Sequence, residues 1–121
     1  MQKLLTKDDS FFIAGSNGMV GKAVLNALNK RGYCDLNKRG KLFIPTRKEL
    51  NLANYEDVIK WFKINKPKIV IVAAAKVGGI YANHKLPYEF ISENLRIAQN
   101  IIEAAWITGS KRLLFLGSSC I

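Results

Sequence analysis

Gly15-Ser16-Asn17-Gly18-Met19-Val20-Gly21 is the stretch on which the expected fold depends. The apolar run Phe11-Phe12-Ile13-Ala14 precedes it, and a helical spacing of apolar residues begins at Met19. A strand that leads through a glycine-rich turn into a helix gathers backbone N–H groups and the positive end of the helix dipole at one point. The first glycine permits a tight turn, the second lets the backbone approach a pyrophosphate, and the third lets the helix lie close to the strand. The stretch therefore predicts a dinucleotide site, although a glycine-rich turn without a ligand shares the bare pattern.

Composition limits the class of protein. The chain has 121 residues, of which 49% are hydrophobic, and this predicts one globular domain rather than a disordered segment. Two cysteines, Cys34 and Cys120, are too few for a disulfide scaffold and fit a reducing compartment. No run approaches the ~20 apolar residues that span a bilayer, and no signal-peptide core follows Met1. We therefore expect a cytoplasmic protein without a membrane partner.

The net charge of +10 raises the question of a nucleic-acid partner. The basic residues are scattered along the chain rather than gathered in blocks, and no aromatic-basic motif accompanies them. We therefore expect no nucleic-acid partner. A positive field of this kind also favours anionic small molecules.

Strand and helix patterns alternate along the chain. The expected strands cover 11–14, 41–45, 69–73 and 112–116, and the expected helices cover 19–31, 55–66 and 88–108. We predict an α/β, Rossmann-type parallel sheet with helices on both faces and the strands in spatial order 3-2-1-4. In that order the fourth strand, 112–116, forms an apolar edge.

The apolar spacing also predicts the buried faces of two helices. In the first helix this face comprises Val20, Ala23, Val24, Ala27 and Leu28. In the long helix it comprises Phe90, Asn94, Ile97, Ile101 and Ala105.

The end of the second strand is where a dinucleotide fold selects its cofactor. An acidic residue there would bond to a ribose 2′-hydroxyl, whereas an arginine accommodates a 2′-phosphate. This chain has Arg47, with Lys48 beside it. The pair favours NADP over NAD, and the alternative is an arginine that is merely solvated.

Small and hydroxylated residues follow the third and fourth strands. Ala74-Ala75 comes after the third strand, and Gly117-Ser118-Ser119-Cys120 comes after the fourth. Folds of this type place their chemistry at the carboxyl ends of parallel strands. His84 has no partner nearby in the sequence, so we assign it a structural role and predict no metal site.

Four segments resemble the GDP-L-fucose synthase family, the epimerase-reductases of the extended short-chain dehydrogenase/reductase superfamily. They are Ala14 to Gly21, Thr46 to Leu52, Ala73 to Ile80 and Leu113 to Ile121. The first is generic to the superfamily, the second is suggestive, and the last two are specific. The resemblance extends over 12–120 and corresponds to the amino-terminal third of such enzymes.

The resemblance implies NADP(H) as cofactor, a GDP-sugar substrate, and a homodimer built partly through the long helix. The implied reaction converts GDP-4-keto-6-deoxy-D-mannose to GDP-L-fucose. Ser118 matches the serine that hydrogen-bonds the substrate carbonyl as hydride arrives, and Cys120 matches the cysteine that exchanges protons beside that carbonyl with a later histidine. The implied cofactor contacts are Gly15, Ser16, Asn17, Gly18, Met19, Val20, Gly21, Arg47, Asn51, Leu52, Ala74, Ala75, Leu116 and Gly117.

The chain also departs from the family. Asn17 stands where some members carry a basic residue, so one possible contact to the 2′-phosphate is absent. In the family, a Tyr-x-x-x-Lys motif follows the serine. Tyr81 and Lys85 have the spacing of this motif, but they precede Ser118, and a pair with this spacing is expected by chance in a chain of this composition. We therefore expect 1–121 to be the amino-terminal part of an NADP-binding Rossmann domain, without a substrate domain and unable to complete the reaction alone. There are two alternatives. The chain is a stand-alone NADP-binding or regulatory module, or it belongs to a related sugar-nucleotide epimerase or dehydratase.

Overall fold

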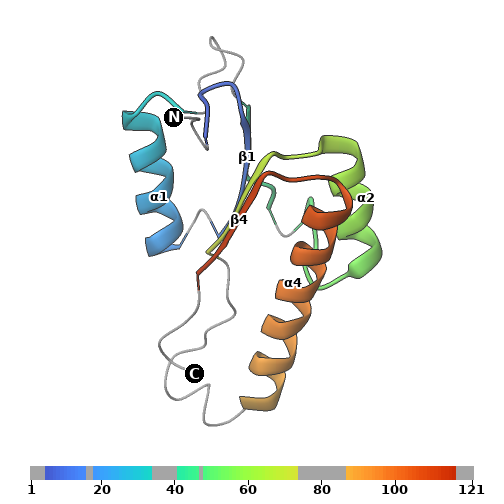
Figure 1. The fold of residues 1–121 in the computed structure, drawn as a ribbon. Helices are drawn as coiled ribbons and strands as arrows, with labels where there is room; N and C mark the ends of the chain where they lie inside the picture. The colour runs from blue at the N-terminus through green and yellow to red at the C-terminus, as the bar shows by residue number, and fades with distance from the viewer. Residues whose placement is uncertain (1–4, 16–17, 34–40, 47, 74–86, 117–121) are drawn as a thin grey trace.

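The computed structural model describes residues 5–15, 18–33, 41–46, 48–73 and 87–116. Strands and helices alternate along them, as Figure 1 shows. The elements are β1 (Ser10–Ala14), α1 (Met19–Lys30), β2 (Lys41–Phe43), α2 (Tyr55–Asn65), β3 (Ile69–Val72), α4 (Pro87–Ile107) and β4 (Arg112–Phe115). Each predicted strand and helix is confirmed in type, and its ends lie within two residues of the prediction.

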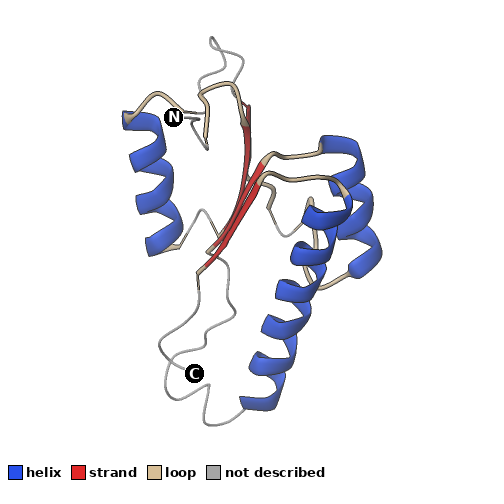
Figure 2. Ribbon diagram, viewed as in Figure 1, coloured by secondary structure: helices blue, strands red, loops and turns tan. Residues whose placement is uncertain are grey.

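The order of the strands differs from the prediction. The parallel sheet, whose strands are red in Figure 2, has the order β2-β1-β3-β4, and the predicted order 3-2-1-4 is wrong. Phe12 of β1 lies opposite Phe43 of β2 on one side and Val70 of β3 on the other. Burial explains the difference, because every residue of β3 is buried and such a strand needs a neighbour along each edge. β2, in which Lys41 is exposed and Leu42 and Phe43 are half-buried, occupies an edge instead.

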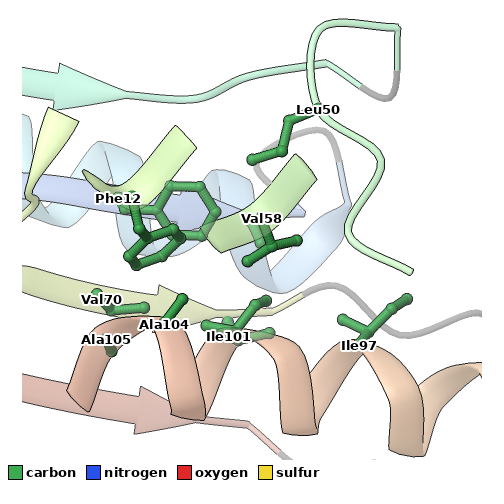
Figure 3. Close-up of a cluster of buried hydrophobic side chains, with 11 residues drawn as sticks. Phe12, Leu50, Val58, Val70, Ile97, Ile101, Ala104 and Ala105 are labelled. Atoms are coloured by element: carbon green, nitrogen blue, oxygen red, sulfur yellow. The ribbon is translucent and has the colours of Figure 1, made fainter. Parts of the chain in front are cut away.

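Helices cover both faces of the sheet, as predicted. Figure 1 shows α1 on one face and both α2 and α4 on the other. Because side chains alternate along a strand, neighbouring residues of β1 enter different cores. Phe12 joins the cluster under α2 and α4, whereas Phe11 joins the cluster under α1. The larger cluster, shown in part in Figure 3, comprises Phe12, Ala14, Leu50, Val58, Phe62, Val70, Val72, Ile97, Ile101, Ala104 and Ala105.

The buried face of α1 is rotated from the predicted one. Val24 and Leu28 pack against the sheet as predicted, together with Leu25. Gly21 is the buried residue of this helix, and it lets the helix axis approach the strands. The contact face is therefore centred on the third glycine of the turn. Three residues of the predicted face are exposed instead: Val20, Ala23 and Ala27.

The buried face of α4 agrees with the prediction. Ile97, Ile101 and Ala105 are buried, and Asn94 is half-buried. The side chain of Phe90 lies outside the described residues. Asn100, which the apolar spacing did not select, is also buried on this face.

β4 forms an exposed edge of the sheet, as predicted. Its apolar side chains Leu113, Leu114 and Phe115 are 38%, 51% and 38% exposed. An open apolar edge of this kind can pair with another strand. Among the described helices, none has the length and apolarity that crossing a membrane requires.

A partly buried ion pair joins the chain before β1 to the chain before β4. Lys111 Nζ lies 2.9 Å from Asp9 Oδ1, and the backbone N–H of Thr6 donates to Asp9 Oδ2 at 2.9 Å. Burial by itself raises the pKa of the Asp9 carboxyl, but the hydrogen bonds from Lys111 and Thr6 and the Lys111 charge together lower this pKa below its ordinary value. The carboxylate is thus held charged at the amino-terminal edge of the sheet.

We expect Lys111→Met to lower the free energy of unfolding at pH 7 by about 0.5–1 kcal/mol, since the lysine side chain is 47% exposed. Because the pKa of Asp9 is lowered in the folded chain, the pair stabilises above the ordinary aspartate pKa of about 4 and loses its effect as the pH falls through the lower folded value. Urea unfolding at pH 7 and pH 3 measures this, with Lys68→Met as control. An equal effect of Lys111→Met at both pH values would contradict the assignment.

Candidate dinucleotide site

The glycine turn between β1 and α1 has the backbone geometry of an anion site. Gly15 has a φ of 85°, and the N–H of Gly18 donates to the Gly15 carbonyl at 3.1 Å. Gly18 is the N-cap of α1; among the described residues no side chain caps the helix, and no acidic residue occupies its first turn. The first N–H groups of a helix have no partner within it. They remain available here for an anion, which the helix dipole also favours.

The turn lies where the strand order reverses. β1 leads to β2 on one side, and the chain then returns past β1 to β3 on the other side. Gly15 follows β1, and the N–H of Ala73, directly after β3, donates to the Ala14 carbonyl at 2.8 Å. Open parallel sheets bind ligands at such a reversal, outside the carboxyl ends of the strands. The corrected order places this reversal between β1 and β3.

A second turn follows β2. The Thr46 hydroxyl donates to Glu49 Oε1 at 3.2 Å and accepts the N–H of Glu49 at 3.3 Å. The N–H of Leu50 also donates to the Thr46 carbonyl at 2.9 Å. These bonds close a turn at the carboxyl end of β2, with Lys48 exposed on it. Arg47, which the sequence assigns to the 2′-phosphate, lies outside the described residues.

The segment after this turn is fixed by side chains. Leu50 is only 4% exposed, and Figure 3 shows it with Val58 and Ile97 toward the carboxyl ends of the strands. Asn51 Oδ1 accepts the N–H of Ala53 at 3.1 Å. Asn100 Nδ2 donates to the carbonyl of Leu52 at 3.0 Å. The segment 50–54 is therefore held both by its own side chains and by α4.

Two further side chains bound the start of α2. Asn54 Oδ1 accepts the N–H of Asp57 at 3.1 Å and so caps the helix. The Tyr55 hydroxyl donates to Glu103 Oε1 at 3.2 Å. Desolvation and the neighbouring Glu103 carboxylate raise the pKa of Tyr55. The hydroxyl thus stays protonated and keeps α2 linked to α4.

The predicted site residues divide into two sets. The described ones lie at the carboxyl edge of the sheet or on the first turn of α1, and they are Gly15, Gly18, Met19, Val20, Gly21, Asn51, Leu52 and Leu116. The assignments to Ser16, Asn17, Arg47, Ala74, Ala75, Gly117, Ser118 and Cys120 lie outside the described residues.

Sequence reasoning missed three residues that shape this edge: Thr46, Glu49 and Asn100. Thr46 and Glu49 have the spacing of a capping box, and that pattern could have identified them. Asn100 interrupts the apolar spacing of α4, and a buried polar residue on such a face indicates a specific partner.

Curated relatives match almost the whole chain. A protein of Arabidopsis thaliana named putative GDP-L-fucose synthase 2 is 46% identical over 118 residues, which are 98% of this chain and 34% of the relative. The GDP-L-fucose synthase of Escherichia coli strain K12 is 47% identical over 110 residues, 91% of this chain and 32% of that protein. The chain thus spans about a third of the length of the curated relatives it matches.

A solved structure and a family profile agree with these relatives. MlghC, a GDP-mannoheptose C4 reductase from Campylobacter jejuni with NADP bound, superposes with a TM-score of 0.82 at 36% identity, over 93% of this chain and 34% of that one. The profile of the NAD dependent epimerase/dehydratase family matches residues 11–121. The chain, with its parallel sheet and glycine turn at the strand reversal, belongs to the NAD dependent epimerase/dehydratase family.

Proposed function

We propose that this chain is the amino-terminal, cofactor-binding part of an NADP-dependent enzyme that epimerises and reduces GDP-4-keto-6-deoxy-D-mannose to GDP-L-fucose. The observation that carries the proposal is the identity of 46% over 118 residues to a relative named as a GDP-L-fucose synthase. We further propose that the substrate domain lies in the part of such enzymes that these 121 residues do not match.

The glycine turn fits a dinucleotide. The uncapped start of α1 offers N–H groups to a pyrophosphate, and buried Gly21 keeps the helix close to the strand. A Cβ on Gly18 would lie 3.5 Å from the Gly15 carbonyl oxygen, an ordinary van der Waals contact, so the fold itself does not require glycine there; the missing side chain leaves the backbone accessible to a phosphate. In the proposed complex Arg47 holds the 2′-phosphate and the segment 50–54 borders the adenine.

The proposed chemistry uses two residues after β4. When bound, NADPH would supply the hydride that reduces the 4-keto carbon. Ser118 donates a hydrogen bond to the carbonyl oxygen, which polarises it and stabilises the negative charge that develops there. Cys120 exchanges protons at the carbons beside the carbonyl, where acidity is greatest. A free thiol in this role requires a reducing compartment, which supports a location in the cytoplasm.

A related GDP-sugar reductase is the second candidate. The 36% identity to the GDP-mannoheptose C4 reductase of C. jejuni favours it, because that protein has the same fold and is named for a different GDP-sugar. In that case the assignments of the NADP-binding residues are unchanged, and the substrate is a GDP-sugar with a different sugar group.

The assignment of Arg47 predicts a cofactor preference. The chain should bind NADPH about ten- to a hundredfold more tightly than NADH, and Arg47→Ala should remove most of that difference because it deletes a charge-assisted hydrogen bond. Calorimetric titration of both cofactors measures this. Arg31→Ala, which removes the same charge at the far end of α1, should keep the preference. An equal loss for both cofactors in Arg47→Ala would reject the assignment.

The proposed roles of Ser118 and Cys120 predict different products. The experiment uses a chimera that joins residues 1–121 to the remaining two thirds of the E. coli relative. Ser118→Ala should slow reduction about a hundredfold, as loss of one oxyanion donor does. Cys120→Ser should slow epimerisation by at least about a hundredfold and accumulate a reduced, unepimerised sugar nucleotide. NMR of the products decides, with Cys34→Ser as control, and normal GDP-L-fucose from Cys120→Ser would refute the acid-base role.

We also propose that the enzyme is a homodimer that uses α4. Leu95, Ile102 and Trp106 are 65%, 46% and 81% exposed, and their spacing of seven and four residues places them on one stripe of the helix. Trp106→Glu should weaken dimerisation of the chimera by about tenfold or more, since a charge would enter an apolar contact. Light scattering after size exclusion measures the mass. Ile64→Glu, on an exposed apolar residue of α2, should leave the dimer intact, and a monomeric parent chimera would disprove the proposal.

A further inference from the structure

Asn100 is a polar residue buried among apolar neighbours on the core-facing side of α4. It is 4% exposed, and its neighbours one turn away, Ile97 and Ala104, are buried in the larger core cluster. A buried carboxamide is unfavourable unless its polar atoms are paired. Its Nδ2 finds that partner at 3.0 Å in the carbonyl of Leu52, which belongs to a different part of the chain. The position thus serves a specific bond rather than apolar packing.

That bond fixes the middle of the segment between β2 and α2. Buried Leu50 anchors one end of the segment, and Asn54 anchors the other as the N-cap of α2. Between them, Asn51 accepts the N–H groups of Ala53 and Asn54 at 3.1 and 3.0 Å through its side chain and its carbonyl. These contacts are local, whereas the bond from Asn100 comes from α4. A second bond from the same face of α4, between Glu103 and Tyr55, secures the start of α2.

The segment lies on the side of the sheet where a dinucleotide places its adenosine. The pyrophosphate of such a ligand sits at the turn after β1, and its adenosine ribose reaches the end of the neighbouring strand, which is β2 here. The backbone that follows β2 therefore faces the adenine. A backbone wall of this kind can bind a base only if its position is fixed beforehand.

We propose that Asn100 is a positioning residue for the adenine end of the cofactor: its bond from α4 to the Leu52 carbonyl holds the segment 50–54 in the shape that receives the adenine. This inference rests on the proposed function. It adds to it a residue that acts without touching the cofactor, through the backbone of Leu52.

The test uses the 121-residue chain and two halves of the cofactor, adenosine 2′,5′-bisphosphate and nicotinamide mononucleotide. Asn100→Asp replaces the donor by an acceptor of the same shape and leaves the Leu52 carbonyl unpaired. It should weaken the binding of adenosine 2′,5′-bisphosphate about tenfold. The affinity for nicotinamide mononucleotide should change by no more than about twofold. Amide hydrogen exchange should quicken at Ala53 and Asn54, whose bonds depend on the same segment.

Two control variants separate positioning from general stability. Gln99→Leu changes the neighbouring, exposed residue of α4 and should alter neither binding nor exchange. Ile101→Val weakens the same core cluster and should lower the melting temperature without a selective loss of the adenosine fragment. Ile101→Val and Asn100→Asp are compared at an equal loss of stability. If both weaken the binding of adenosine 2′,5′-bisphosphate equally, Asn100 is merely structural and the inference fails.

The outcomes also separate this inference from the proposed function. Tight binding of adenosine 2′,5′-bisphosphate by both the parent chain and Asn100→Asp would overturn the role of Asn100 and leave the NADP assignment standing. A parent chain that binds neither fragment would overturn both.

Discussion

The pairing of β1 with β3 is the interaction on which the structure depends. Phe11 to Ala14 lie in register with Ile69 to Val72, and both strands are buried on both faces. The two strands supply the central side chains of both core clusters, so each helix packs against this pair. Loss of the pairing would remove the surface against which α1, α2 and α4 pack.

The same pairing creates the candidate site. Because β1 and β3 are neighbours while β2 lies on the far side of β1, the chain reverses direction across the sheet between them. The helices that follow them, α1 after β1 and α4 after β3, lie on opposite faces of the sheet (Figure 1), and open parallel sheets bind ligands at such a reversal. Gly15 and Ala73 directly follow the two strands at this reversal, and the bond from Ala73 to Ala14 continues the strand ladder to their carboxyl ends.

The type of each element could be predicted from the sequence because local patterns determine it. The unbroken apolar runs of β1 and β3, the cap at Asn54 and the spacing of Ile97, Ile101 and Ala105 act within a few residues. The strand order was predicted wrongly because it depends on which strands compete for the buried centre, and that competition involves residues far apart in the chain. The strand order could have been inferred only by comparing two strands: β2 begins with the exposed Lys41, whereas every residue of β3 is buried. Asn100 escaped for the same reason, since its partner Leu52 is 48 residues away.

Polar contacts divide the sheet into a stabilised edge and an edge shaped for binding. At the amino-terminal edge, Asp9 binds Lys111, and Ser110 donates to the Pro67 carbonyl at 2.7 Å, so these polar side chains find their partners within the fold. At the carboxyl edge, Thr46, Asn51 and Asn100 bond to backbone groups of the connecting segments. The bonds at the carboxyl edge shape the backbone of the connecting segments, and among the described residues no side chain caps the N–H groups in the first turn of α1. A fold that satisfies its own polar groups at one edge can thus leave the other edge prepared for an anionic ligand.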